Sequence, residues 1–234
     1  MIWVILILFL ASLTRSSIGF GDSVLAMAFL PFVIKIKTAT PIVSLAAIVI
    51  GSLILWRQWR NVDVTSVWRL ILSSIAGIPL GVWVLHNLPE SVVKRGLAIF
   101  LLAFALYNLF RPSLFHLKSD NWAFLAGFIA GVFGAAYNTN GPPVVVYASL
   151  RRWSPVRFVA TIQGYFLPTG VFIVIGHGVA GLWTREVLVF FGAGVPFIAL
   201  AVWLGSLLRD RIPQETFQKV LYIVLLVAGG MMLA

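Results

Sequence analysis

The chain has 234 residues, of which 61% are apolar and only 10% are charged. A soluble domain of this length could not cover so much apolar surface with polar groups, so the composition excludes a water-soluble globular protein. The net charge of +10 does not indicate nucleic-acid binding, because the basic residues lie in short clusters between apolar runs. We therefore expect an all-α polytopic membrane protein whose solvent is the lipid bilayer.

Apolar runs between charge and turn signals predict about ten helical segments along the chain. In the first half they cover residues 2–14, 18–34, 41–56, 66–86 and 91–110. In the second half they cover residues 122–136, 141–150, 156–176, 185–208 and 216–233. Polar stretches at residues 14–17 and 137–143 separate the first pair of segments in each half. Short or broken helices are therefore expected to open each half.

The two halves carry similar punctuation, which predicts an internal repeat. Gly81 precedes Pro89 at the same spacing as Gly205 precedes Pro213. Each repeat would have about five segments, and an odd number of crossings inverts the second copy relative to the first. The two expected repeats of this single membrane domain cover residues 1–118 and 119–234.

The connections on one face carry more lysine and arginine than those on the other, when they are assigned alternately to the two faces. The richer face is expected to be cytoplasmic, because basic residues are retained on that side of a membrane. This assignment places both termini outside.

The first polar break combines a cation, a carboxylate, hydroxyls and glycines inside an apolar hairpin. Its candidate ligand-binding residues are Arg15, Ser16, Ser17, Gly19, Gly21 and Asp22. Charged groups at membrane depth are energetically unfavourable and indicate function, and amides exposed by an unwound glycine backbone suit an anion. The alternative is that Arg15 and Asp22 only pair with each other as a structural bridge, or that Arg15 lies at the membrane interface.

The second polar break is uncharged. Its candidate ligand-binding residues are Asn138, Thr139, Asn140, Gly141 and Pro142. Consecutive prolines prevent the preceding residues from continuing as helix, and glycine permits close approach of a ligand. Irregular backbone at membrane depth is tolerated only beside protein or a watery cavity, so this break is expected to line a cavity. The alternative is an ordinary exposed loop.

Gln163, in the eighth segment, is a further candidate. A buried amide needs a hydrogen-bonding partner in hydrocarbon, and that partner could be a ligand or a neighbouring helix. The sequence leaves both open.

The residue inventory gives little support for catalysis. The chain has no cysteine, which excludes disulfides and thiolate chemistry. His86, His116 and His177 are expected in connections, without a second ligand at metal-binding spacing. We therefore expect no metal, no cofactor and no enzymatic activity.

These residues resemble the TauE/SafE family of sulfite and sulfonate exporters. The resemblance rests on the glycine-rich hairpin at residues 19–22, the break at residues 138–143 with the following run at residues 151–155, and the twofold repeat. It covers essentially the whole chain. Family members commonly have three consecutive glycines and no acid at the first break, whereas here Asp22 follows Gly21.

The resemblance implies a secondary transporter that exports a small sulfur-containing anion, such as sulfite or sulfoacetate, across a bacterial inner membrane. The expected mechanism is alternating access around a site near the midplane, with Asp22 providing coupling to protons or sodium. The alternative is a cation-coupled carrier or channel that uses Asp22 for another small ion. Whether the protein acts alone or as a homodimer stays open.

Overall fold

The helices of this computed structural model follow the predicted order along the chain. The structure describes residues 1–19, 21–58, 67–110, 117, 119–153, 155–208 and 214–233. The elements in this described part are α1 (Ile2–Ile18), α2 (Asp22–Phe29), the 3₁₀ turn η1 (Leu30–Phe32), α3 (Ile36–Gln58), α4 (Trp68–Asn87), α5 (Glu90–Phe110), α6 (Trp122–Tyr137), α7 (Gly141–Leu150), α8 (Pro155–Val179), α9 (Arg185–Leu208) and α10 (Gln214–Leu233). The described residues form no strand, so the fold is all-helical.

The first helix runs through a stretch where a break was predicted. The hydroxyls of Thr14, Ser16 and Ser17 each donate a hydrogen bond to the carbonyl four residues earlier, so they are satisfied inside the helix. The helix ends only at Gly19, whose φ of 96° lies in the left-handed region that favours glycine. The predicted separation of the first two helices at residues 14–17 is therefore wrong, because these polar side chains bond back into α1.

Two other helices are longer than the sequence indicated. α3 begins at Ile36, so Pro41 lies inside the helix instead of opening it. α8 continues to Val179, which places His177 within a helix and not in a connection. The His177 side chain is buried and bonds to Ser44 Oγ at 3.1 Å and to the carbonyl of Ala135 at 2.7 Å. These contacts join α3, α6 and α8.

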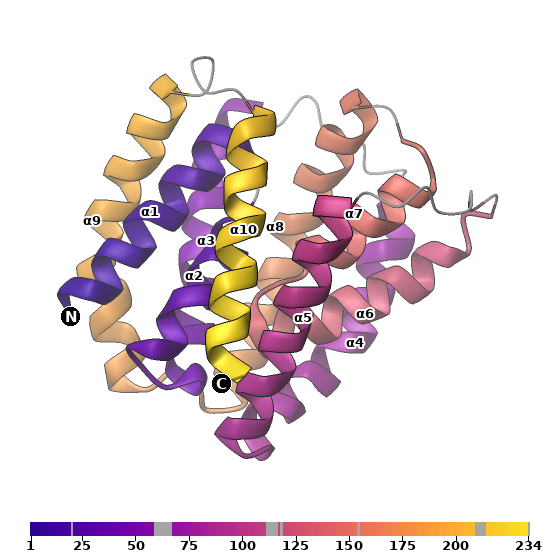
Figure 1. The fold of residues 1–234 in the computed structure, drawn as a ribbon. Helices are drawn as coiled ribbons and strands as arrows, with labels where there is room; N and C mark the ends of the chain where they lie inside the picture. The colour runs from indigo at the N-terminus through magenta and orange to yellow at the C-terminus, as the bar shows by residue number, and fades with distance from the viewer. Residues whose placement is uncertain are drawn as a thin grey trace.

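The two short helix pairs form hairpins that pack into the other half of the chain. α1 and α2 form the first hairpin, and α6 and α7 form the second. α1 packs along α9, α6 packs along α4, and α5 packs along α10, while α3 and α8 contact each other. Figure 1 shows α1 beside α9 at one side of the molecule and α6 beside α4 at the other. The two halves therefore interlock.

Small residues allow the hairpins to approach their partner helices closely. On α4 and α6, Gly77 and Gly131 lie where a Cβ would clash with the backbone of the facing helix. At the other contact, Gly205 of α9 faces Ser16 of α1, whose hydroxyl also bonds to the carbonyl of Ala201 at 3.2 Å. Close contact of small residues is the usual way in which helices associate in membranes.

The outer surface is apolar. Among the described residues, four stretches are long and apolar enough to cross a membrane: Ile36–Leu53, Trp68–Asn87, Glu90–Phe110 and Arg185–Leu208. Large hydrophobic side chains such as Ile99, Leu200 and Val227 are exposed on the outer helices. Surfaces of this kind are stable in lipid and not in water. The chain is an integral membrane protein.

Candidate functional site

A central cavity lies where the two hairpins meet the middle of α3 and α8. Its volume is about 30 Å³. Ala47 and Ile48 border it from α3, and Phe166 and Gly170 border it from α8. Eight of the twelve residues predicted to bind a ligand line this cavity: Arg15, Gly21, Asp22, Asn138, Thr139, Asn140, Gly141 and Pro142. Both predicted breaks therefore reach the same small space.

Arg15 and Asp22 form a buried ion pair at the cavity. Arg15 Nη1 lies 2.9 Å from Asp22 Oδ2, and the two side chains are 5% and 10% exposed. The guanidinium carbon of Arg15 also lies 5.2 Å from the centre of the Phe166 ring, within range of a cation–π interaction. Arg15 Nε has no hydrogen-bonding partner among the described residues. The guanidinium thus keeps one buried donor free beside the cavity.

Two helices begin at the cavity. α2 starts at Asp22 after Gly21, whose φ of 98° turns the chain, and α7 starts at Gly141 after Asn140. The first amides of a helix have no partner within it, and its start carries a partial positive charge. Pro142 is followed by a second proline and neither has an N–H group, so α7 offers fewer amide donors than α2. The start of α2 therefore presents more amide donors to the cavity than the start of α7.

The side chains of the second break are buried and connect the two hairpins. Asn138 adopts a left-handed conformation with φ of 53°, and its Nδ2 donates to Ser23 Oγ at 3.0 Å. Asn140 Nδ2 donates to Thr169 Oγ1 on α8 at 3.3 Å. Asn138, Thr139 and Asn140 are 4%, 0% and 8% exposed, which does not fit the alternative of an ordinary exposed loop.

The remaining predicted residues lie elsewhere. Ser16 and Ser17 direct their hydroxyls to backbone carbonyls of α1 and α9 and are not among the cavity residues. Gly19 ends α1 outside the cavity lining. Gln163 belongs to α8, but its side chain lies outside the part that the structure describes. Phe166 also lines the cavity, and nothing in the sequence marks it, because its side chain has no polar group.

Comparison with known protein families gives one match over nearly the whole chain. The family is described as Sulfite exporter TauE/SafE, and its model matches residues 4–232. No curated protein and no solved structure matches the chain. The family match is therefore the comparison that bears on function.

Proposed function

The chain belongs to the TauE/SafE family of sulfite exporters, and on this premise we propose that it exports a small sulfur-containing anion such as sulfite or an organosulfonate. The proposed location is a bacterial inner membrane, and the proposed process is secondary transport and not catalysis. The observation that carries the proposal is the buried Arg15 beside the central cavity, with Nε free of any described partner.

The anion would bind between Arg15 and the start of α2. A guanidinium offers several N–H donors in a planar fork, which matches the oxygens of a sulfite or sulfonate group. The unpaired amides at the start of α2 add donors and a favourable dipole. Asn138, Thr139 and Asn140 also border the cavity and would complete the set of contacts.

Asp22 would couple anion binding to the binding of a cation. Its carboxylate already occupies Arg15 Nη1, so an incoming anion competes with it for the same guanidinium. A proton on Asp22, or a sodium ion beside it, would remove this competition. The anion and the coupling cation would then bind together, and transport of the anion would increase as the pH falls.

The cavity is too small for free passage of the substrate. A volume of about 30 Å³ holds roughly two water molecules, so an anion can reach Arg15 only after the surrounding helices move. We propose that this movement is a rocking of two inverted repeats, residues 1–118 and 119–234, around the central site.

Two features support the inverted repeats. α1 ends at left-handed Gly19 and α6 ends at left-handed Asn138, and each is followed shortly by a short helix. The packing is also reciprocal, because α1 contacts α9 as α6 contacts α4. An exchange of the two halves would therefore reproduce both contacts.

Uptake into proteoliposomes at different pH values tests the proposal, with sulfite and with sulfoacetate, whose charge stays constant near neutral pH where sulfite itself takes up a proton. Asp22→Asn should remove the pH dependence of the sulfoacetate flux, because its side chain can no longer take up a proton. Glu90→Gln provides a matched control, since Glu90 pairs with Lys94 at 3.3 Å and does not border the cavity. Unchanged pH dependence in Asp22→Asn would remove Asp22 from the coupling role, and sulfite flux that persists in Arg15→Gln would overturn the binding site.

A further inference from the structure

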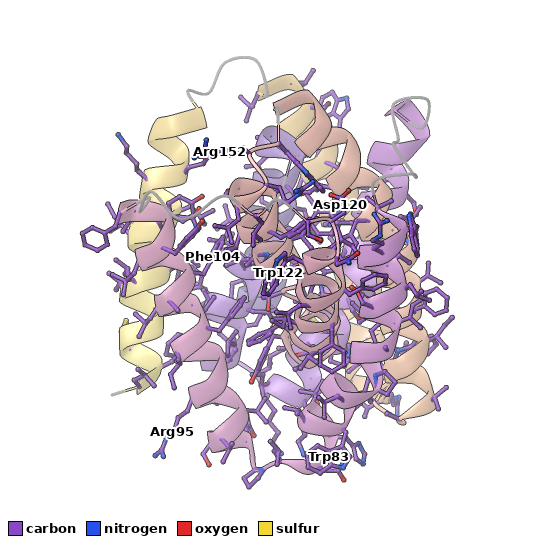
Figure 2. The ribbon with its side chains drawn as sticks, turned by 90° about the vertical axis from the view of Figure 1, so that its right-hand side faces the viewer. Trp83, Arg95, Phe104, Asp120, Trp122 and Arg152 are labelled. Carbon is purple, nitrogen blue, oxygen red and sulfur yellow. The ribbon has the colours of Figure 1, made fainter. Side chains whose placement is uncertain are left out.

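A second cavity opens on the outer side of the protein, between α5, α6 and α7. This groove has a volume of about 510 Å³. Its walls are almost entirely apolar and include Phe104 and Tyr107 from α5, Trp122 and Ile129 from α6, and Val146 from α7. Figure 2 views this side of the molecule. The groove is far larger than the central cavity and faces the bilayer.

A groove of this kind is filled by hydrocarbon when the protein is in a membrane. Its apolar wall provides almost no hydrogen-bonding groups for water. If the groove were empty, the atoms that line it would lose their van der Waals contacts on that side. Lipid acyl chains are the hydrocarbon that surrounds the protein. A chain alone would bind with little selectivity, because the groove and the bilayer interior are equally apolar. Selectivity must therefore come from the headgroup at the end of the groove.

Arg152 supplies an unpaired cation at that end. α7 ends at Leu150, which lines the groove, and Arg152 follows in the turn. Arg151 is held by the carbonyl of Leu117 and by Asp120, whereas the side chain of Arg152 is exposed and has no hydrogen bond or ion pair with a described residue. The φ of Arg152 is 51°, a left-handed conformation that is unfavourable for arginine.

We propose that the groove binds an acyl chain of an anionic phospholipid whose phosphate lies against Arg152. Figure 2 shows Arg152 above Trp122 and Phe104, so a chain that starts at the guanidinium would run down along both rings. Among the described residues, Arg69 and the neighbouring Arg151 share the single carboxylate of Asp120, so this group does not neutralise Arg152 as well. Basic groups at the membrane surface favour anionic headgroups.

The bound chain would contact α7, which also borders the central cavity. Pro142 borders both the cavity and the groove. At the first hairpin α10 packs against α2, whereas at the second hairpin α5 leaves the groove between itself and α7. The acyl chain would therefore pack against α7 as α10 packs against α2. The proposal depends on the fold and not on which ion is transported.

Native mass spectrometry of the purified protein tests the proposal, after incubation with equal amounts of phosphatidylglycerol and phosphatidylcholine that carry the same chains. We expect one retained phosphatidylglycerol per chain. Arg152→Gln should lower its retention about fivefold, the factor that corresponds to roughly 1 kcal/mol for a cation near an anionic surface. Ala103→Phe should fill the groove and lower the retention of both lipids. The controls Arg95→Gln and Ala199→Phe, which change exposed residues away from the groove, should retain lipid as the wild type does.

Three results would overturn the proposal. Equal retention of the two lipids by the wild type, or unchanged retention in Arg152→Gln, would exclude recognition of the headgroup. Unchanged retention in Ala103→Phe would exclude the groove. Leu125→Cys places a thiol at the groove in a chain that has no cysteine, and disulfide-linked dimers of this variant in membranes would identify a second copy of the chain as the occupant.

Discussion

The stability of Asp22→Asn tests the role of the buried ion pair. The substitution removes the carboxylate that lies 2.9 Å from Arg15, whose side chain is only 5% exposed. A buried charge that loses its partner destabilises a protein by about 3–5 kcal/mol. For a chain of this length each kcal/mol corresponds to about 2–4 °C in melting temperature, so Asp22→Asn should melt about 6–20 °C below the wild type.

Sulfite should restore part of the lost stability. An anion that takes the place of the carboxylate beside Arg15 stabilises the folded state by about 2.7 kcal/mol at a concentration of 100 times its Kd. The melting temperature of Asp22→Asn should therefore rise more with sulfite than that of the wild type, in which sulfite must first displace Asp22. The assay is thermal unfolding in lipid nanodiscs at fixed pH, with chloride as the control anion. Equal shifts in both proteins would contradict competition between sulfite and Asp22 for Arg15. No loss of stability in Asp22→Asn would contradict a stabilising role of the ion pair.

Further substitutions test the packing of the hairpins and the turn of the second break. Gly205→Ala places a Cβ against Ser16 Oγ and should destabilise the protein by about 1–3 kcal/mol. Gly192→Ala is the control: it lies in the same helix, and no atom comes within 4 Å of the new Cβ. It should be neutral or stabilise the protein by up to about 1 kcal/mol. Equal melting temperatures for the two variants would contradict the close contact between Gly205 and Ser16. Asn138→Ala and Asn138→Gly both lose the hydrogen bond to Ser23. Asn138→Ala should lower the melting temperature more, because a φ of 53° is strained for alanine and not for glycine. An equal loss in the two variants would show that the conformation of the turn contributes nothing.

Helix positions could be predicted where the ends carry strong local signals. α7 and α9 have the predicted bounds, because glycine with two prolines begins α7 and a charged pair begins α9. The prediction failed at residues 14–17, because a run of polar residues in the sequence resembles a loop. The sequence does not show that their hydroxyls bond to carbonyls of the same helix. It also failed at Pro41, because a membrane helix can include a proline when neighbouring groups satisfy the freed carbonyl.

The site was predicted in part. Charges, glycines and prolines are conspicuous in an apolar chain, so both polar regions were identified as candidate sites, although the first helix breaks later than predicted. The structure brings residues of both regions to one cavity. The direction of a side chain from a helix depends on its packing partner, which explains why Ser16 and Ser17 turn to α9 without any sign in the sequence. Apolar residues of the cavity such as Ile48 and Phe166 carry no signal in a chain that is 61% apolar.

Flux measurements on the purified protein in proteoliposomes test whether it transports a sulfur-containing anion. Sulfite, sulfoacetate, sulfate and chloride would be compared, each with and without an imposed pH gradient. We expect saturable flux of sulfite or sulfoacetate that responds to the gradient. Absence of anion flux, together with a leak of sodium or protons, would contradict this expectation and identify Asp22 as part of a cation pathway.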